Sequence, residues 1–297
     1  MNCSLKEELL YKLNEINSSG KALHGRAERI EQVRNLTSSI SEKYGDLVAA
    51  NLQGLLYHFL ISEAADVSDL ISALTASASL DALTASREEE DGFDSRYGTV
   101  TSLILSPFEL PETISVEQAV TSSRCHPSPV TSVNMALDAL PTYGIKYSNS
   151  VFIDVGSGLG RNLLLASHYP FKKIIGIERS HYLASVSKDN IAVYHNPGVK
   201  CRQIEVLCLN ALDFSFPMEN MVLYFWWPFT EDIAHQFFSR LQRFMQSCPV
   251  SVTLVFLNYV FEAVTASCCF RLIDKFTTPD LVRAEKDHFS VSVYSNQ

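Results

Sequence analysis

The chain has 297 residues, of which 46% are hydrophobic and 19% are charged. This balance is ordinary for a globular protein and excludes wholesale disorder, and the length suits one large domain with an extension. The formal net charge of −9 provides no overall basic field that would attract nucleic acid or an anionic membrane surface.

Residues 1–88 are predicted to form an α-helical N-terminal extension. Apolar residues recur every three or four positions in three stripes, which begin at Leu5, Leu47 and Leu70. We expect such helices to pack on each other or to cover the neighbouring domain, and the alternative is a dedicated partner-binding module. Residues 89–126 are predicted to be an acidic, solvated linker and an irregular approach segment of the kind that forms a substrate-side lid.

From about residue 150, apolar strand-like runs alternate with helical patterns, which predicts a parallel sheet flanked by helices. The expected strands span residues 151–155, 173–178, 204–209, 221–226 and 250–257, and the expected helices span residues 163–168, 181–194 and 233–245. Two last strands, 270–276 and 288–294, are separated by a turn at 277–280, which suits an antiparallel hairpin. The fold class is therefore α/β, with a terminal antiparallel hairpin and a helical extension.

The loop after the first predicted strand has glycine at every second position: Gly156, Gly158 and Gly160. Glycines there let the backbone turn tightly and approach a ligand closely at the carboxyl edge of a parallel sheet. A dinucleotide site would need a glycine at position 161, where this chain has Arg161. A nicotinamide-dependent oxidoreductase is therefore disfavoured.

Polar residues follow the next two predicted strands. Glu178 ends the second strand, where a carboxylate can accept two hydrogen bonds from a ribose diol. The alternative is a surface glutamate at a strand end. Asn210 and Asp213 follow the third strand, and either side chain can address the exocyclic amine of adenine. We favour Asn210, with Asp213 as the cap of a short helix.

The seven cysteines show no CxxC pair and no zinc-binding spacing with histidine, so no metal site is predicted. Their odd number without a framework favours a reducing compartment. Cys268 and Cys269 are expected to be core residues of a strand. No apolar run reaches the ~18 residues of a membrane-spanning helix, and no signal peptide is visible, so a cytoplasmic protein is expected.

Taken together, the glycine loop, Glu178, the Asn210-Ala211 turn and the terminal hairpin resemble the class I, Rossmann-like methyltransferases that use S-adenosylmethionine (SAM). The resemblance covers roughly residues 120–297. It looks closest to a poorly characterised bacterial group that shares the Pro-Ser-Pro element at residues 127–129, and it extends more weakly to non-SET histone-lysine and protein-lysine methyltransferases. It implies a seven-stranded methyltransferase sheet, a SAM-binding domain over residues 127–297, and SAM as the cofactor.

The resemblance also implies roles for single residues. Asp154 would organise the loop and meet the methionine ammonium, directly or through water, and Glu178 would hold the ribose. Other residues would lie along the cofactor: Gly156, Ser157, Gly158 and Gly160 in the loop beneath it, Asn210 and Ala211 at the adenine, and Ser128 at the methionine end.

The strand 221–226 is followed by Trp227 and Pro228, where amine methyltransferases of this class often have Asn-Pro-Phe. Trp227 cannot accept a hydrogen bond through its side chain, but an indole wall suits a methylammonium group through cation–π attraction. The backbone carbonyls of both residues also remain available. Trp227 and Pro228 are therefore the candidate catalytic residues, with core packing as the alternative for Trp226 and Trp227.

Three further residues have open interpretations. Asn258 and Tyr259 either bind substrate or cap a strand, and His126 is either a general base or polar surface. Methyl transfer from a sulfonium depends mainly on positioning, so no dedicated base is required. The predicted function is a SAM-dependent methyltransferase of unknown acceptor, with a protein lysine amino group as the first guess. The alternative is a catalytically inactive SAM-fold protein that binds a partner through its helical N-terminus.

Overall fold

The computed structural model describes residues 92–103, 125–279 and 288–296, together with the single positions 11, 12, 14, 35, 105 and 110. The helices predicted within residues 1–88 and most of the approach segment lie outside the described residues. The chain divides into two compact units, one of Met1–Ser86 with Ile104–Val120 and one of Arg87–Leu103 with Thr121–Gln297. Every helix and strand named below belongs to the second unit.

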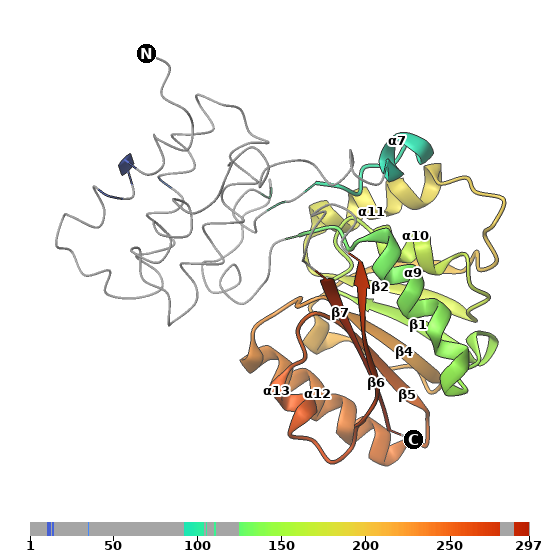
Figure 1. The fold of residues 1–297 in the computed structure, drawn as a ribbon, viewed down its shortest axis with the longest axis vertical. Helices are drawn as coiled ribbons and strands as arrows, with labels where there is room; N and C mark the ends of the chain where they lie inside the picture. Colours follow the sequence, from blue (N-terminus) through green and yellow to red (C-terminus); the bar gives the residue numbers. More distant parts are fainter. Residues whose placement is uncertain are drawn as a thin grey trace. The chain divides into compact units, whose positions relative to one another are not determined.

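A seven-stranded sheet forms the centre of this unit (Figure 1). Its order is β3-β2-β1-β4-β5-β7-β6; the first five strands in the chain run parallel, and β7 runs antiparallel to both β5 and β6. The predicted sheet with its terminal hairpin is confirmed. The strands are β1 (Ser150–Val155), β2 (Lys173–Glu178), β3 (Ile204–Cys208), β4 (Asn220–Phe225), β5 (Val252–Leu257), β6 (Arg271–Pro279) and β7 (His288–Ser295).

Helices cover both faces of the sheet (Figure 1). Because alternate residues of a strand point to opposite faces, Phe152 packs in one core and Ile153 in the other, and every residue of β1 is buried. One core includes α7 (Phe93–Tyr97), α9 (Val130–Ala139), α10 (Arg161–Ala166) and α11 (His181–Val193), and the other includes α12 (Glu231–Ser247) and α13 (Glu262–Thr265).

The chain order reverses at the centre of the sheet. β2 lies on one side of β1 and β4 lies on the other, so the connections leave β1 and β4 in opposite directions. Ligands of open α/β sheets bind at such a point, beyond the carboxyl ends of the strands. The glycine loop, which follows β1 directly, lies at this position.

The terminal hairpin differs from the prediction in its length. β6 continues to Pro279, through the residues predicted to form a turn, because its pairing with β7 extends to the end of the strand. A proline is tolerated there because β6 is an edge strand. Thr278 is fully buried, and its hydroxyl is 2.6 Å from the Ser132 hydroxyl of α9.

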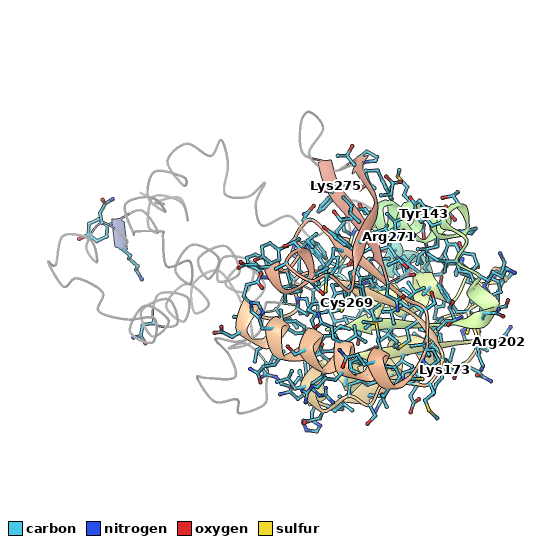
Figure 2. The ribbon with its side chains drawn as sticks, turned by 90° about the horizontal axis from the view of Figure 1, so that it is seen from below. Tyr143, Lys173, Arg202, Cys269, Arg271 and Lys275 are labelled. Atoms are coloured by element: carbon cyan, nitrogen blue, oxygen red, sulfur yellow. The ribbon has the colours of Figure 1, made fainter. Side chains whose placement is uncertain are left out.

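The start of β6 corrects a second expectation. Cys268 and Cys269 lie in the turn before this strand, so their prediction as strand residues is wrong. Cys268 is exposed, and only Cys269 packs against the core, where it is partly buried. Charged side chains occupy the exposed edge instead, as Figure 2 shows for Arg271 and Lys275. Charges on an edge strand discourage pairing with another chain. Tyr143, at the end of the 3-10 helix Leu140–Tyr143 that follows α9, donates a hydrogen bond of 2.6 Å to Asp274 on this edge (Figure 2).

None of the helices that the structure describes is long and apolar enough to cross a membrane. Among the same residues, no group of three histidine, cysteine or carboxylate side chains is placed to hold a metal ion.

Candidate functional site

The glycine loop has the backbone that its sequence requires. Gly156, Gly158 and Gly160 have φ angles of 80°, 51° and 88°, in the region that favours glycine. A Cβ atom at Gly156 would lie 2.6 Å from the Cβ of Pro228, and one at Gly158 would lie 2.9 Å from the Sγ of Cys125. Glycine is therefore needed here both for the turn and for close packing against the chain itself.

Glu178 holds this loop in place. Its carboxylate accepts hydrogen bonds from the backbone N–H groups of Gly158 (2.9 Å) and Ser180 (2.8 Å). Burial raises the pKa of Glu178, and these backbone N–H groups oppose that shift. Each carboxylate oxygen has a second acceptor site, so Glu178 can still accept from a ribose hydroxyl. The carboxylate predicted to hold the ribose thus also supports the loop.

Asp154 lies beneath the loop, 2% exposed. Asn162 at the start of α10 donates a hydrogen bond to the carboxyl group, while Oδ2 has no partner among the described residues. Burial and the nearby charge of Glu178 raise the pKa of Asp154 to about 7. A buried carboxyl oxygen that lacks a donor fits the ammonium group of an amino acid, which would supply both a donor and a compensating charge.

Ser128 joins the same buried polar cluster. It is 4% exposed, and the Tyr224 hydroxyl donates to its Oγ at 3.3 Å. Tyr224 is the neighbour of Asp154 across the β1–β4 pair, so their side chains share one face of the sheet. Burial raises the pKa of Tyr224, and the charge of Asp154 adds to the effect. Ser128 therefore connects the approach element to the end of the sheet where the methionine is expected.

Asn210 and Ala211 follow β3 as predicted. The Asn210 Oδ1 accepts from the backbone N–H of Leu212 at 3.0 Å and caps the short 3-10 helix Ala211–Asp213. The expectation that Asp213 is the cap is therefore wrong, because the cap position lies one residue before the helix begins. The exposed Asn210 amide is the group that remains to address adenine.

Trp227 and Pro228 lie beyond the end of β4. The strand stops at Phe225, before Trp226, which was predicted to be its last residue. Trp227 has a φ angle of 47°, is 37% exposed and stacks on Tyr259 with ring centroids 5.1 Å apart. Pro228 lies against Gly156, as described above, so the loop after β4 directly contacts the glycine loop.

Tyr259 and Asn258 have different surroundings. Asn258 is a structural residue: its φ angle is 64°, and its Oδ1 accepts from the backbone N–H of Ser290 at 2.9 Å. The Tyr259 hydroxyl donates to Glu231 Oε1 at 2.6 Å. Burial and this hydrogen bond raise the pKa of Tyr259 to about 12. Of these two residues after β5, only Tyr259 contacts Trp227, whereas Asn258 bonds the backbone of Ser290.

His126 is half-buried rather than part of the polar surface. Its ring lies edge-on to Trp226 with centroids 4.8 Å apart. The next residue toward the N-terminus, Cys125, lies against Gly158, and burial together with the charge of Glu178 raises its pKa to about 12. A thiol at this pKa stays protonated at neutral pH. Cys125 was not among the predicted site residues, and nothing in its sequence context signals its position.

A second group that sequence reasoning missed surrounds Asp94. This buried carboxylate accepts hydrogen bonds from the Thr99 hydroxyl (2.7 Å), from the hydroxyl and N–H of Thr101 (2.6 and 2.7 Å) and from the Ser102 N–H (2.8 Å). Burial raises its pKa, but these hydrogen bonds outweigh that effect and leave the pKa below the usual value. The signal available in the sequence was an aspartate followed by three closely spaced hydroxyl residues.

Arg161 connects this group to the glycine loop. Its guanidinium donates to the hydroxyls of Thr101 (2.9 Å) and Ser102 and lies 5.2 Å from the centre of the Phe93 ring. Asn190 of α11 donates to the Leu159 carbonyl within the loop at 2.9 Å and also pairs with the backbone of Val100. Residues 92–103 are therefore hydrogen-bonded to residues in and beside the glycine loop. Arg161, which stands where a dinucleotide motif has glycine, has a structural role in these contacts.

No family model and no curated protein matches the sequence. Several solved structures are similar to part of the chain. An RNA methyltransferase from Salinibacter ruber, in complex with S-adenosyl-L-homocysteine, is 15% identical over 57% of this chain and 92% of that chain, with a TM-score of 0.38. Magnesium protoporphyrin IX methyltransferase from Synechocystis, with bound SAM, is 11% identical over 57% of this chain and 79% of that chain, with a TM-score of 0.42.

A putative methylase from Haemophilus influenzae is 19% identical over 56% of this chain and 88% of that chain, with a TM-score of 0.38. The second unit has the Rossmann-like fold of the class I SAM-dependent methyltransferases, as its strand order and terminal hairpin indicate. A function for this chain has to be argued from its own residues.

Proposed function

We propose that the chain binds SAM at the carboxyl edge of β1 and β2 and transfers its methyl group to an acceptor beside Trp227. The observation that carries this proposal is the pair of carboxyl groups around the glycine loop. Glu178 accepts from the Gly158 N–H and can still accept from a ribose, while Asp154 offers a buried Oδ2 that has no donor within the part of the chain that the structure describes. These are the two complementary groups that a ribose diol and a methionine ammonium require.

When bound, SAM supplies a methyl group that its sulfonium makes electrophilic. The residues of this chain would orient it: Glu178 at the ribose, Asp154 at the ammonium, and Asn210 with Ala211 at the adenine. Transfer requires an in-line approach of the acceptor, so positioning is the main contribution of the protein. The contact of Pro228 with Gly156 supports a role for the Trp227-Pro228 loop as the wall between cofactor and acceptor.

For the acceptor we propose an amino group, with a protein lysine as the first to test. Trp227 and Tyr259 form an aromatic stack beside the carboxylate of Glu231. Aromatic faces and a carboxylate both attract an ammonium or methylammonium group. A polyanionic acceptor would be repelled by Glu231 and by the net charge of −9.

The experiment that tests this function is incubation of the full chain with methyl-labelled SAM and lysine-rich proteins, with RNA in a parallel reaction. Label on lysine nitrogen supports the whole proposal. Label on RNA would contradict the acceptor while supporting methyl transfer. Cofactor binding without transfer to any acceptor would favour the alternative, a SAM-fold protein that acts as a partner-binding module, because Trp227 stands where active relatives often have asparagine.

A further inference from the structure

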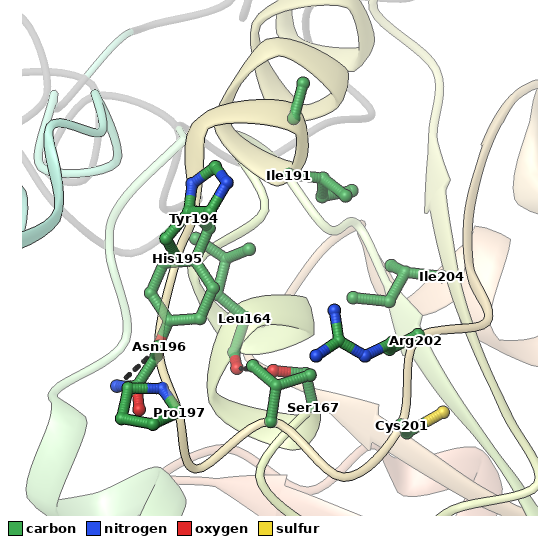
Figure 3. A pocket seen from close by; sticks show the side chains of 12 residues that line it. Leu164, Ser167, Ile191, Tyr194, His195, Asn196, Pro197, Cys201, Arg202 and Ile204 are labelled. Carbon is green, nitrogen blue, oxygen red and sulfur yellow. Dashed lines mark hydrogen bonds between the residues drawn. The ribbon is translucent and has the colours of Figure 1, made fainter.

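A cavity lies at the opposite end of the parallel strands from the glycine loop. It has a volume of about 470 Å³, within the range of small-molecule pockets. The ends of α10 and α11 and the chain that leads into β3 form its walls (Figure 3). Gly156 and Glu178, by contrast, lie at the carboxyl ends of β1 and β2. This cavity is therefore separate from the proposed cofactor site.

Apolar side chains make up much of the cavity wall. Leu164 is completely buried, and Ile191, Pro197 and Ile204 are among the other residues that line the space (Figure 3). The Tyr194 ring adds an aromatic surface to this wall. Its hydroxyl is hydrogen-bonded to His168 Nε2 at 2.7 Å, which fixes the position of the ring. A flat apolar group would be desolvated between such walls.

Hydrogen bonds hold the surrounding loop in one conformation. The Ser167 carbonyl at the end of α10 accepts from the backbone N–H groups of Lys200 (2.8 Å) and Cys201 (2.9 Å). The Asn196 side chain accepts from the Gly198 N–H at 2.8 Å and donates to the Tyr97 hydroxyl at 2.9 Å. A preformed cavity avoids much of the entropy cost of ordering a binding loop.

A cation, Arg202, is among the residues that line this cavity. Figure 3 shows the Arg202 side chain extending over the space from the loop before β3. Within residues 92–103, 125–279 and 288–296, no carboxylate forms an ion pair with Arg202. The nearby Glu205 of β3 pairs with Lys173 instead, at 2.5 Å. A guanidinium is always charged and offers a planar fork of donors that matches a carboxylate.

We propose that this cavity binds a small monocarboxylate that carries a flat apolar body. The carboxylate would pair with the Arg202 guanidinium, and the apolar body would lie between Tyr194 and the aliphatic wall of Ile191 and Ile204. A single guanidinium balances a single negative charge, and the apolar wall excludes a ligand that is charged throughout. This site does not depend on the cofactor assignment.

The test uses the full chain and two probes of the same shape, phenylacetate and its neutral analogue phenylacetamide. Titration followed by ligand-observed NMR should give saturable binding of phenylacetate with a dissociation constant on the order of 1 mM, as expected for a ligand of this size. Phenylacetamide should bind about tenfold more weakly or worse, because it lacks the charge that Arg202 recognises.

Three variants locate the site. Arg202→Gln should weaken phenylacetate binding about tenfold or more and leave phenylacetamide unaffected. Ile191→Trp, which fills the cavity, should weaken both probes. Lys200→Gln is the matched control, since Lys200 is an exposed cation of the same loop outside the cavity lining, and it should leave both affinities unchanged. Absence of saturable phenylacetate binding, or equal affinity in wild type and Arg202→Gln, would overturn the proposal.

Discussion

The Glu178 carboxylate accepts a hydrogen bond of 2.9 Å from the backbone N–H of Gly158, 20 residues earlier in the chain. This contact joins the acidic end of β2 to the glycine loop after β1. The same carboxylate accepts from the Ser180 N–H at the start of α11. Glu178 is therefore both a candidate ligand for a ribose and a brace for the loop on which a cofactor would lie.

Replacement of Glu178 by glutamine should weaken both functions. Glutamine keeps one acceptor oxygen, so one of the two backbone N–H groups loses its partner. We expect a loss of roughly 1–3 kcal/mol in the free energy of unfolding and a loss of about 1.5–3 kcal/mol in SAM affinity. Urea denaturation and calorimetric titration measure the two effects. Unchanged SAM affinity in a folded variant would remove Glu178 from the site.

Two glycine variants distinguish the stability cost of the Pro228–Gly156 contact from the cost of backbone strain. Gly156 and Gly144 have φ angles of 80° and 81°, but a Cβ at Gly144 meets nothing within 4 Å. Gly144→Ala should cost roughly 1–2 kcal/mol for the left-handed conformation alone. Gly156→Ala should cost about 1–3 kcal/mol more because it also clashes with Pro228.

Denaturant unfolding of both glycine variants provides the measurement. Equal losses of stability would mean that the loop after β4 does not press on the glycine loop. A larger loss in Gly156→Ala, accompanied by weaker SAM binding, would support the contact between the two loops.

Asp154 should make stability depend on pH in the direction opposite to that of a salt-bridged carboxylate. Burial raises its pKa from 3.8 to about 7, so between these values the folded chain binds a proton that the unfolded chain has lost. The free energy of unfolding should therefore fall as pH rises through this window, by roughly 2–4 kcal/mol, and level off above pH 7.

Asp154→Asn removes this titration. The difference in stability between variant and wild type should shift in favour of the variant as pH rises from about 4 to about 7, within the window given by the pKa of Asp154. Denaturation at several pH values measures it. Parallel pH profiles for the two proteins would contradict the raised pKa.

Substitutions of Trp227 test its proposed role beside the methyl acceptor. Trp227→Ala should reduce methyl transfer far more than SAM affinity, and it should cost about 0.5–1.5 kcal/mol of stability from the lost stack on Tyr259. Trp227→Asn is the sharper variant, because asparagine tolerates the φ angle of 47° better than most residues. A gain in transfer for this variant would indicate that the natural chain is a weakened enzyme.

Tyr259→Phe is the matched control for this series. It keeps the stacked ring and removes the hydroxyl bonded to Glu231. If Trp227→Ala lowers SAM binding and transfer equally, the indole is structural, and its assignment as an acceptor wall is wrong.

The order of strands and helices from β1 to β7 could be predicted from the sequence because apolar runs and their spacing report burial directly. Lys173–Glu178 has the predicted bounds. The end of β4 was not predicted because Trp226 and Trp227 are strand-forming residue types, yet they lie beyond the strand and pack against His126 and Tyr259. The pattern of apolar residues along the chain does not report contacts between distant residues.

Some residues of the candidate site could be predicted from the sequence, and others could not. The glycines, Asp154 and Glu178 could be found because each lies within, at the end of or directly after a strand that the pattern identifies. The support from Asp94 and Arg161 could not, since Arg161 donates to the Thr101 hydroxyl, 60 positions earlier in the chain, and that hydroxyl donates to Asp94. A contact of this range depends on the tertiary fold.

The central claim is that the glycine loop with Asp154 and Glu178 binds SAM. Calorimetric titration of the full chain with SAM and with S-adenosylhomocysteine tests it most directly. The account predicts saturable binding of both at one molecule per chain, lost when Gly158 is replaced by valine, whose side chain would collide with Cys125. A folded wild type that shows neither heat nor a thermal shift with either compound would contradict it.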